Sequence, residues 1–171
     1  MENTKAPPLL EKDAEGVTVL EKLLDARKKL RLFQMALTNY LVYVSQRKDG
    51  TQASVHTLPA LLAPTTEPLR LEDQALAIRA LLASARSLEI PVFRWAAVDT
   101  YYGLNRAFFD REAAFYATTI GPDARAAGRA SLSEIALTLL AGEEVSPFLP
   151  PDARAQWQQI SRPWLRALED F

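Results

Sequence analysis

PVFRWAAVDTYYGLNRAFFDREAAFYATTI, residues 91–120, is the stretch that decides the fold, and it holds eight of the fifteen aromatic residues of the chain. When it is placed on a helix at about 100° per residue, one stripe is apolar: Phe93, Ala97, Tyr101, Leu104, Phe108 and Phe115. A second stripe of small residues, including Ala96 and Gly103, would let a neighbouring helix approach closely. A helix that is apolar around most of its girth is a buried one. Residues 91–120 are therefore predicted to form the central helix of an all-α domain.

The N-terminal part of the chain predicts one long helix. Thr18 and Glu21 have the spacing of a capping box, and helical periodicity continues to about Arg47. Its seam is read as Leu20, Leu23, Arg27, Leu30, Gln34, Leu37, Leu41 and Val44. Because Arg27 and Gln34 interrupt this seam, a bundle helix is favoured over a strict coiled coil. The basic cluster Arg27, Lys28, Lys29 and Arg31 spreads around the helix, which favours a solvated turn over a phosphate-binding patch.

Three further segments carry helical signals. Residues 71–88 have a buried seam of Leu71, Ala75, Ile78, Leu82 and Ala85, and Pro91 follows so closely that the next helix should be an antiparallel neighbour. Ser131 and Glu134 form a second capping box, which opens a short helix predicted to end at Gly142. The last helix should begin near Asp152 and continue through Pro163 with a kink.

At 171 residues the chain can bury a core as one domain. We predict a flexible leader at 1–16 and a single helical domain at 17–171, a bundle of about five or six helices around the central helix. The predicted core residues are Leu37, Leu41, Ile78, Leu82, Phe93, Leu104, Phe108, Phe115, Ile135, Leu139, Trp157 and Ile160.

The composition argues against several classes of chemistry. The absence of cysteine removes disulfides and thiolate metal sites, and the single histidine, His56, cannot build a multi-histidine site and is interpreted as structural. No glycine-rich phosphate loop is present, so no cofactor or metal is predicted and an enzyme is not favoured. No targeting segment is recognised, which makes the cytoplasm the expected location. The longest apolar window, 32–44, is shorter than a membrane span.

A polar stripe on the central helix is the sharpest candidate site. It combines aromatic, charged and amide side chains beside the apolar core: Trp95, Asp99, Tyr102, Asn105 and Arg106. Such a stripe is more often a satisfied network between helices, with Asp99 and Arg106 as its charged members. The other interpretation is a ligand pocket, in which Arg106 takes a carboxylate or phosphate by a two-pronged contact.

These observations favour a non-enzymatic module that docks a helical face onto a protein partner, as an assembly subunit, adaptor, chaperone or inhibitor, or onto a second copy of itself. One alternative is a small-molecule-binding regulatory domain with its pocket on the central helix. Another is a DNA-associated regulator acting through residues 131–146, which resemble the first helix and turn of a helix-turn-helix. The prolines at 147, 150 and 151 would break the recognition helix that should follow, and Glu143 and Glu144 would face the DNA phosphates with the wrong charge.

Overall fold

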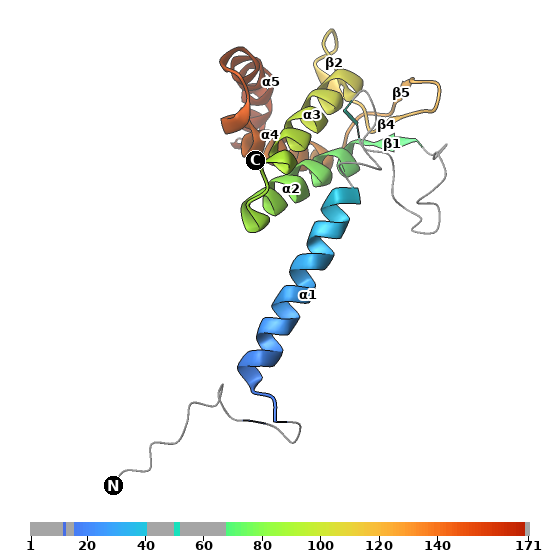
Figure 1. Cartoon of the computed structure of the whole chain (residues 1–171). Coiled ribbons are helices and arrows are strands. Elements are labelled where there is room, and N and C mark those ends of the chain that lie inside the picture. The colour runs from blue at the N-terminus through green and yellow to red at the C-terminus, as the bar shows by residue number, and fades with distance from the viewer. Residues whose placement is uncertain (1–11, 13–15, 41–49, 52–67, 170–171) are drawn as a thin grey trace. The chain divides into compact units, whose positions relative to one another are not determined.

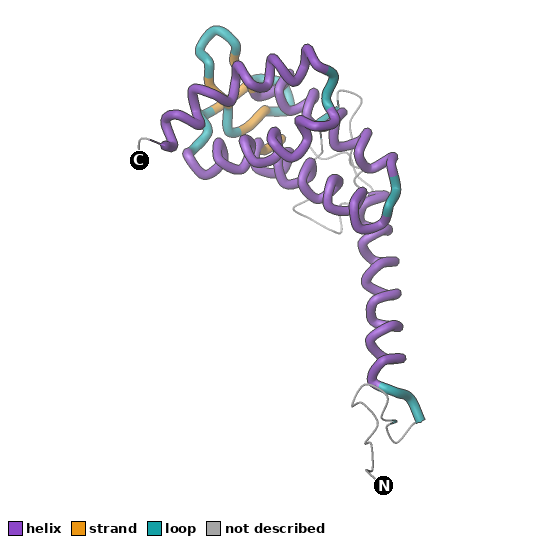
Figure 2. Tube along the Cα trace, turned by 90° about the vertical axis from the view of Figure 1, so that its left-hand side faces the viewer, coloured by secondary structure: helices purple, strands orange, loops and turns teal. Residues whose placement is uncertain are grey.

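The structure, a computed structural model, describes residues 12, 16–40, 50–51 and 68–169. The chain divides into two compact units, residues 1–37 and 38–171. Most of the predicted leader, the end of the first predicted helix (41–47) and His56 lie outside the described residues. The described part is mainly helical with short antiparallel strands (Figures 1 and 2), which confirms the helical fold class in its coarse form.

Helix α1 (Val19–Tyr40) begins at the predicted capping box. The Thr18 hydroxyl accepts a hydrogen bond from the backbone N–H of Glu21 at 3.1 Å, and the Glu21 carboxylate accepts one from the Thr18 N–H at 2.8 Å. These bonds satisfy backbone donors that no helical carbonyl can reach. From Val19 to Leu37 the apolar side chains of α1 are exposed, except Met35, which is half-buried. Leu37, predicted as a core residue, is 47% exposed, so that prediction is wrong.

Helices α2 (Leu71–Leu88) and α3 (Pro91–Phe108) form the heart of the second unit and lie side by side in Figure 1. The predicted bounds of α2 and all five residues of its seam are confirmed as helical and buried. Glu89 closes α2 in the left-handed conformation with φ of 59°. Proline then starts α3 at a position where its missing N–H costs nothing.

The predicted central helix is too long, because α3 ends at Phe108 and not near Ile120. Strands β2 (Phe109–Asp110) and β3 (Phe115–Tyr116) follow as an antiparallel hairpin. The carboxylate of Asp110 accepts hydrogen bonds from the backbone N–H groups of Glu112 and Ala113 at 2.9 and 3.0 Å. This side-chain turn competes with helix formation and ends the helix.

A small three-stranded sheet covers one end of the helical pair. Its strands are β1 (Leu69–Arg70), β4 (Thr119–Ile120) and β5 (Ala126–Ala127), in the order β1-β4-β5 with antiparallel pairing. Leu69 lies opposite Ile120, and Thr119 lies opposite Ala127. The sheet therefore anchors the start of α2 to the chain that follows the β2–β3 hairpin.

Helix α4 (Leu132–Val145) starts at the predicted capping box of Ser131 and Glu134. It continues through Gly142, so the prediction that it ends there is wrong and no turn begins at that glycine. The 3-10 helix η4 (Ser146–Phe148) leads into α5 (Pro151–Glu169), which runs through Pro163 as predicted. A salt bridge of 3.0 Å between Arg79 and Glu144 joins α2 to α4.

The core of the second unit is apolar and close to the prediction. The predicted residues that are buried are Ile78, Leu82, Phe93, Leu104, Phe108, Ile135, Leu139 and Trp157. Phe115 and Ile160 are half-buried, and Leu41 lies outside the described residues. The indole of Trp157 lies against Gly142, and its N–H donates to the Glu143 carboxylate at 3.0 Å. This contact fixes α5 against α4.

Candidate functional site

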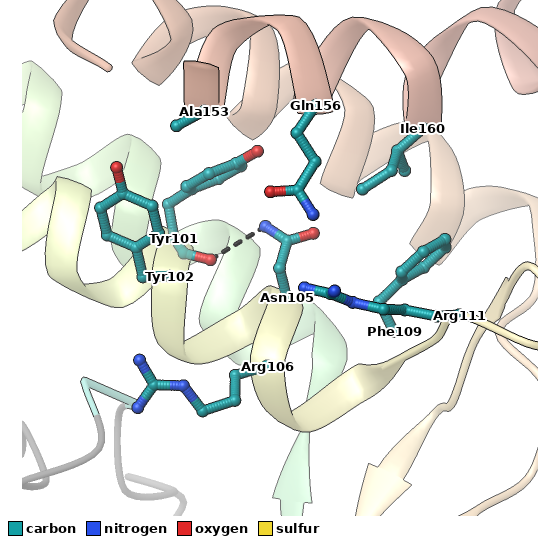
Figure 3. A pocket seen from close by; sticks show the side chains of 9 residues that line it. All are labelled: Tyr101, Tyr102, Asn105, Arg106, Phe109, Arg111, Ala153, Gln156 and Ile160. Atoms are coloured by element: carbon teal, nitrogen blue, oxygen red, sulfur yellow. Dashed lines mark hydrogen bonds between the residues drawn. The ribbon is translucent and has the colours of Figure 1, made fainter. Parts of the chain in front are cut away.

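A pocket of about 430 Å³ lies between α3, the β2–β3 hairpin and α5 (Figure 3). Its lining residues are Tyr101, Tyr102, Asn105, Arg106, Phe109, Arg111, Ala153, Gln156 and Ile160. The volume falls in the lower part of the range of small-molecule sites. Aromatic and aliphatic walls with a few polar groups are the usual composition of such sites.

Asn105 is the fixed polar centre of this pocket. Its amide nitrogen donates to the backbone carbonyl of Tyr101 at 2.9 Å, one turn earlier on α3. Its amide oxygen accepts from the hydroxyl of Tyr116 on β3 at 2.8 Å. The Tyr116 ring in turn packs on Phe109 with centroids 4.9 Å apart. The side chain of Asn105 therefore has one orientation, set by the helix on one side and the hairpin on the other.

The tyrosines around Asn105 are held neutral. Burial is the main cause that raises the pKa of Tyr101 well above its ordinary value, and Tyr102 beside it adds to the rise. Burial likewise raises the pKa of Tyr116, with a further contribution from Tyr101. The pKa of Tyr102 is raised by burial first and then by Asp152 and Asp99. These hydroxyls can donate or accept hydrogen bonds near neutral pH but offer no phenolate nucleophile.

Two arginines supply the positive charge of the pocket. Arg106 and Arg111 are both exposed, and neither has a hydrogen bond or ion pair to another described residue. In Figure 3 the guanidinium of Arg111 extends toward Asn105, whereas the side chain of Arg106 extends away from α5. Arg111 is thus the cation better directed at a ligand between α3 and α5.

The structure divides the predicted polar stripe. Tyr102, Asn105 and Arg106 line the pocket, while Trp95 and Asp99 do not. Trp95 is 67% exposed, and within the described part of the chain no ion pair joins Asp99 to Arg106. Sequence reasoning assigned Tyr101 to the apolar stripe and Ile160 to the core. It did not place Phe109, Arg111, Ala153 or Gln156 at a site. Arg111 reaches the pocket only because the hairpin turns back at Asp110, and that turn was hidden by the expectation of a continuous helix.

A second candidate surface lies on α1, within the first unit. Its apolar residues follow an alternating spacing of four and three, which is the heptad pattern of helix pairing. We call this set the α1 seam, and it consists of Val19, Leu23, Ala26, Leu30, Phe33 and Leu37. All six side chains are exposed, and Leu30 reaches 69%. The seam chosen from the sequence shares Leu23, Leu30 and Leu37 with this one. Between them it takes Arg27 and Gln34 instead of Ala26 and Phe33, so the uninterrupted pattern was missed.

Comparisons with known proteins give no independent assignment. No protein-family description, curated protein or solved structure matches this chain. Among the described residues, no cluster of three or more histidine, aspartate or glutamate side chains is arranged to hold a metal ion. Within the same part of the chain, no helix has both the length and the hydropathy needed to cross a bilayer. Function must therefore be argued from the pocket and the α1 seam.

Proposed function

We propose that this chain is a helical interaction module that docks the α1 seam onto a helix of a protein partner. The observation that carries the proposal is the uninterrupted row of six exposed apolar side chains between Val19 and Leu37. The row spans about 27 Å at 1.5 Å per residue. A contiguous exposed apolar surface of this kind marks an interaction site, and heptad spacing favours a helix as the partner.

Leu32 provides a matched control for this proposal. It is an exposed leucine on the same helix, 53% accessible, but it lies on the side of α1 away from the seam. A photo-crosslinking amino acid at position 30 should capture a partner protein in the native cell, whereas the same amino acid at position 32 should not. Equal capture from both positions, or capture from neither, would count against the proposal.

A second candidate function is favoured by the pocket, which could bind a small carboxylate or phosphate. Arg111 supports the charge contact, because a guanidinium pairs with such anions through two hydrogen bonds. Asn105 and Gln156 support orientation of the ligand by adding amide groups to the same lining. Tyr101 and Phe109 supply apolar walls.

A thermal-shift screen with carboxylate and phosphate metabolites tests this second function. A ligand at 100 times its Kd adds about 2.7 kcal/mol to the free energy of unfolding. Arg111→Ala should remove this stabilisation, whereas Arg106→Ala should retain most of it, since Arg106 extends away from α5. Both arginines are exposed, so each variant should change the stability of the free protein by less than about 1 kcal/mol. Absence of any hit would remove the pocket as a candidate.

A further inference from the structure

Three of the five cationic side chains of α1 lie along the edges of the α1 seam. The helix carries five basic and two acidic residues, a net charge of +3. At about 100° per residue, Lys22 and Lys29 flank one edge of the seam, and Arg27 flanks the other. The acidic residues, Glu21 and Asp25, fall farther around the helix. In heptad terms the flanking positions hold three cations, Lys22, Arg27 and Lys29, besides Leu20, Gln34 and Ala36, and no anion.

This arrangement disfavours a second copy of the chain as the partner. In a parallel pair, Lys22 of one copy would face Arg27 of the other. In an antiparallel pair like edges meet, so Lys22 of one copy would face Lys29 of the other. The seam itself also departs from the pattern of parallel dimers, because leucine occupies Leu23 and Leu30 where β-branched residues favour two-stranded pairing.

We infer that the partner of the α1 seam is an amphipathic helix of another protein with glutamate or aspartate on both flanks of its apolar stripe. The inference rests on the proposed function of α1 as a docking helix. Opposite charge at the flanking positions selects partner and orientation and discriminates against like-charged helices. Lys29 already forms an exposed salt bridge with Asp25 at 2.7 Å. Exposed pairs of this kind contribute little, so a partner carboxylate can replace Asp25.

The test uses the full chain and two synthetic peptides of four heptads. Both peptides have leucine and isoleucine at the seam positions, and one has glutamate at every flanking position while the other has lysine. Like charge keeps each peptide from pairing with itself. Fluorescence anisotropy should show the glutamate peptide binding roughly tenfold more tightly, or better, with the difference shrinking as salt rises.

Three variants of the chain make the result specific. Leu30→Glu should abolish binding of the glutamate peptide, while Leu32→Glu should leave it within about twofold, since Leu32 lies off the seam. Replacing Lys22, Arg27 and Lys29 together by glutamate should reverse the preference, so that the lysine peptide binds better.

The outcomes separate the partner class from docking itself. Equal affinity for the two peptides would overturn the inference of an acidic partner but leave α1 as a docking helix. The same holds if light scattering shows that the chain is a dimer and that Leu30→Glu dissociates it. If neither peptide binds and crosslinks from position 30 form only within the same chain, both the acidic partner and the docking function of α1 are overturned. A tenfold preference for glutamate with reversal in the triple variant supports the inference.

Discussion

Gly142 lies inside α4, where glycine ordinarily weakens a helix relative to alanine by roughly 0.5–1 kcal/mol. At this position alanine should instead be less stable than glycine, because a Cβ would overlap the six-membered ring of the buried Trp157 indole. We expect Gly142→Ala to lower the free energy of unfolding by about 1–3 kcal/mol, as overpacked core positions do. Urea denaturation measures the change.

Trp157→Phe provides the control for that substitution. The smaller ring should leave room for a methyl group at position 142, so Gly142→Ala should cost less in the Trp157→Phe background than in the wild type. Equal costs in the two backgrounds would show that the indole is not what requires glycine at this position.

The buried tyrosines near Asn105 predict a loss of stability at high pH. In the unfolded chain Tyr101 and Tyr116 lose their protons near pH 10. In the folded chain burial raises both pKa values, so the folded state keeps protons that the unfolded state has released. By linkage, the stability that these two tyrosines contribute is fully present below about pH 10 and is lost as the pH rises above that value.

Urea midpoints at pH 8, 10 and 11 test this dependence. Tyr116→Phe removes the hydrogen bond to Asn105, so its free energy of unfolding at pH 8 should be about 1 kcal/mol lower than that of the wild type. Its stability should then fall less steeply above pH 10 than that of the wild type, since one titrating group is gone. Parallel curves for the two proteins would contradict the assignment of the pH effect to Tyr116.

At the scale of elements, α1 and α2 are predicted to differ sharply in their contribution to stability. Ile78 on α2 is fully buried, so Ile78→Ala should cost about 2–5 kcal/mol through lost burial and the cavity left behind. Leu30 on α1 is 69% exposed, so Leu30→Ala should change stability by no more than about 0.5 kcal/mol. Paired denaturation curves measure both effects. A large loss for Leu30→Ala would mean that α1 is buried in the isolated protein.

The elements also differ in how far the sequence could predict them. The bounds of α2 follow from one uninterrupted seam and from Pro91 just beyond it, and they are confirmed. The end of α3 was missed because its aromatic residues satisfy helical spacing as well as the β2–β3 hairpin, and the side-chain turn at Asp110 decides between them. In the pocket, Asn105 was predictable from its place on α3. Arg111 was not, because the local turn at Asp110 that brings it to the pocket was hidden by the expectation of a continuous helix.

At the scale of the whole molecule, every described buried residue lies between Thr38 and Ser161. The unit at 38–171 therefore contains the described core, together with a buried hydrogen bond of 2.9 Å between the hydroxyls of Thr38 and Ser84. Residues 16–37 contribute exposed and half-buried side chains only. Most of the stability of a helix in a protein comes from packing of its apolar face, and the α1 seam is exposed.

Removing residues 1–37 tests whether the core depends on them. Because the cut keeps Thr38 and removes no described buried side chain, the shortened chain should unfold cooperatively with a free energy within about 1 kcal/mol of the full chain. The full chain should in addition lose part of its helical circular dichroism at low urea, before the main transition, as unpartnered α1 frays. Adding the glutamate peptide should move that early loss to higher urea, because binding stabilises only folded α1. If the shortened chain fails to fold, residues 17–171 form one cooperative domain.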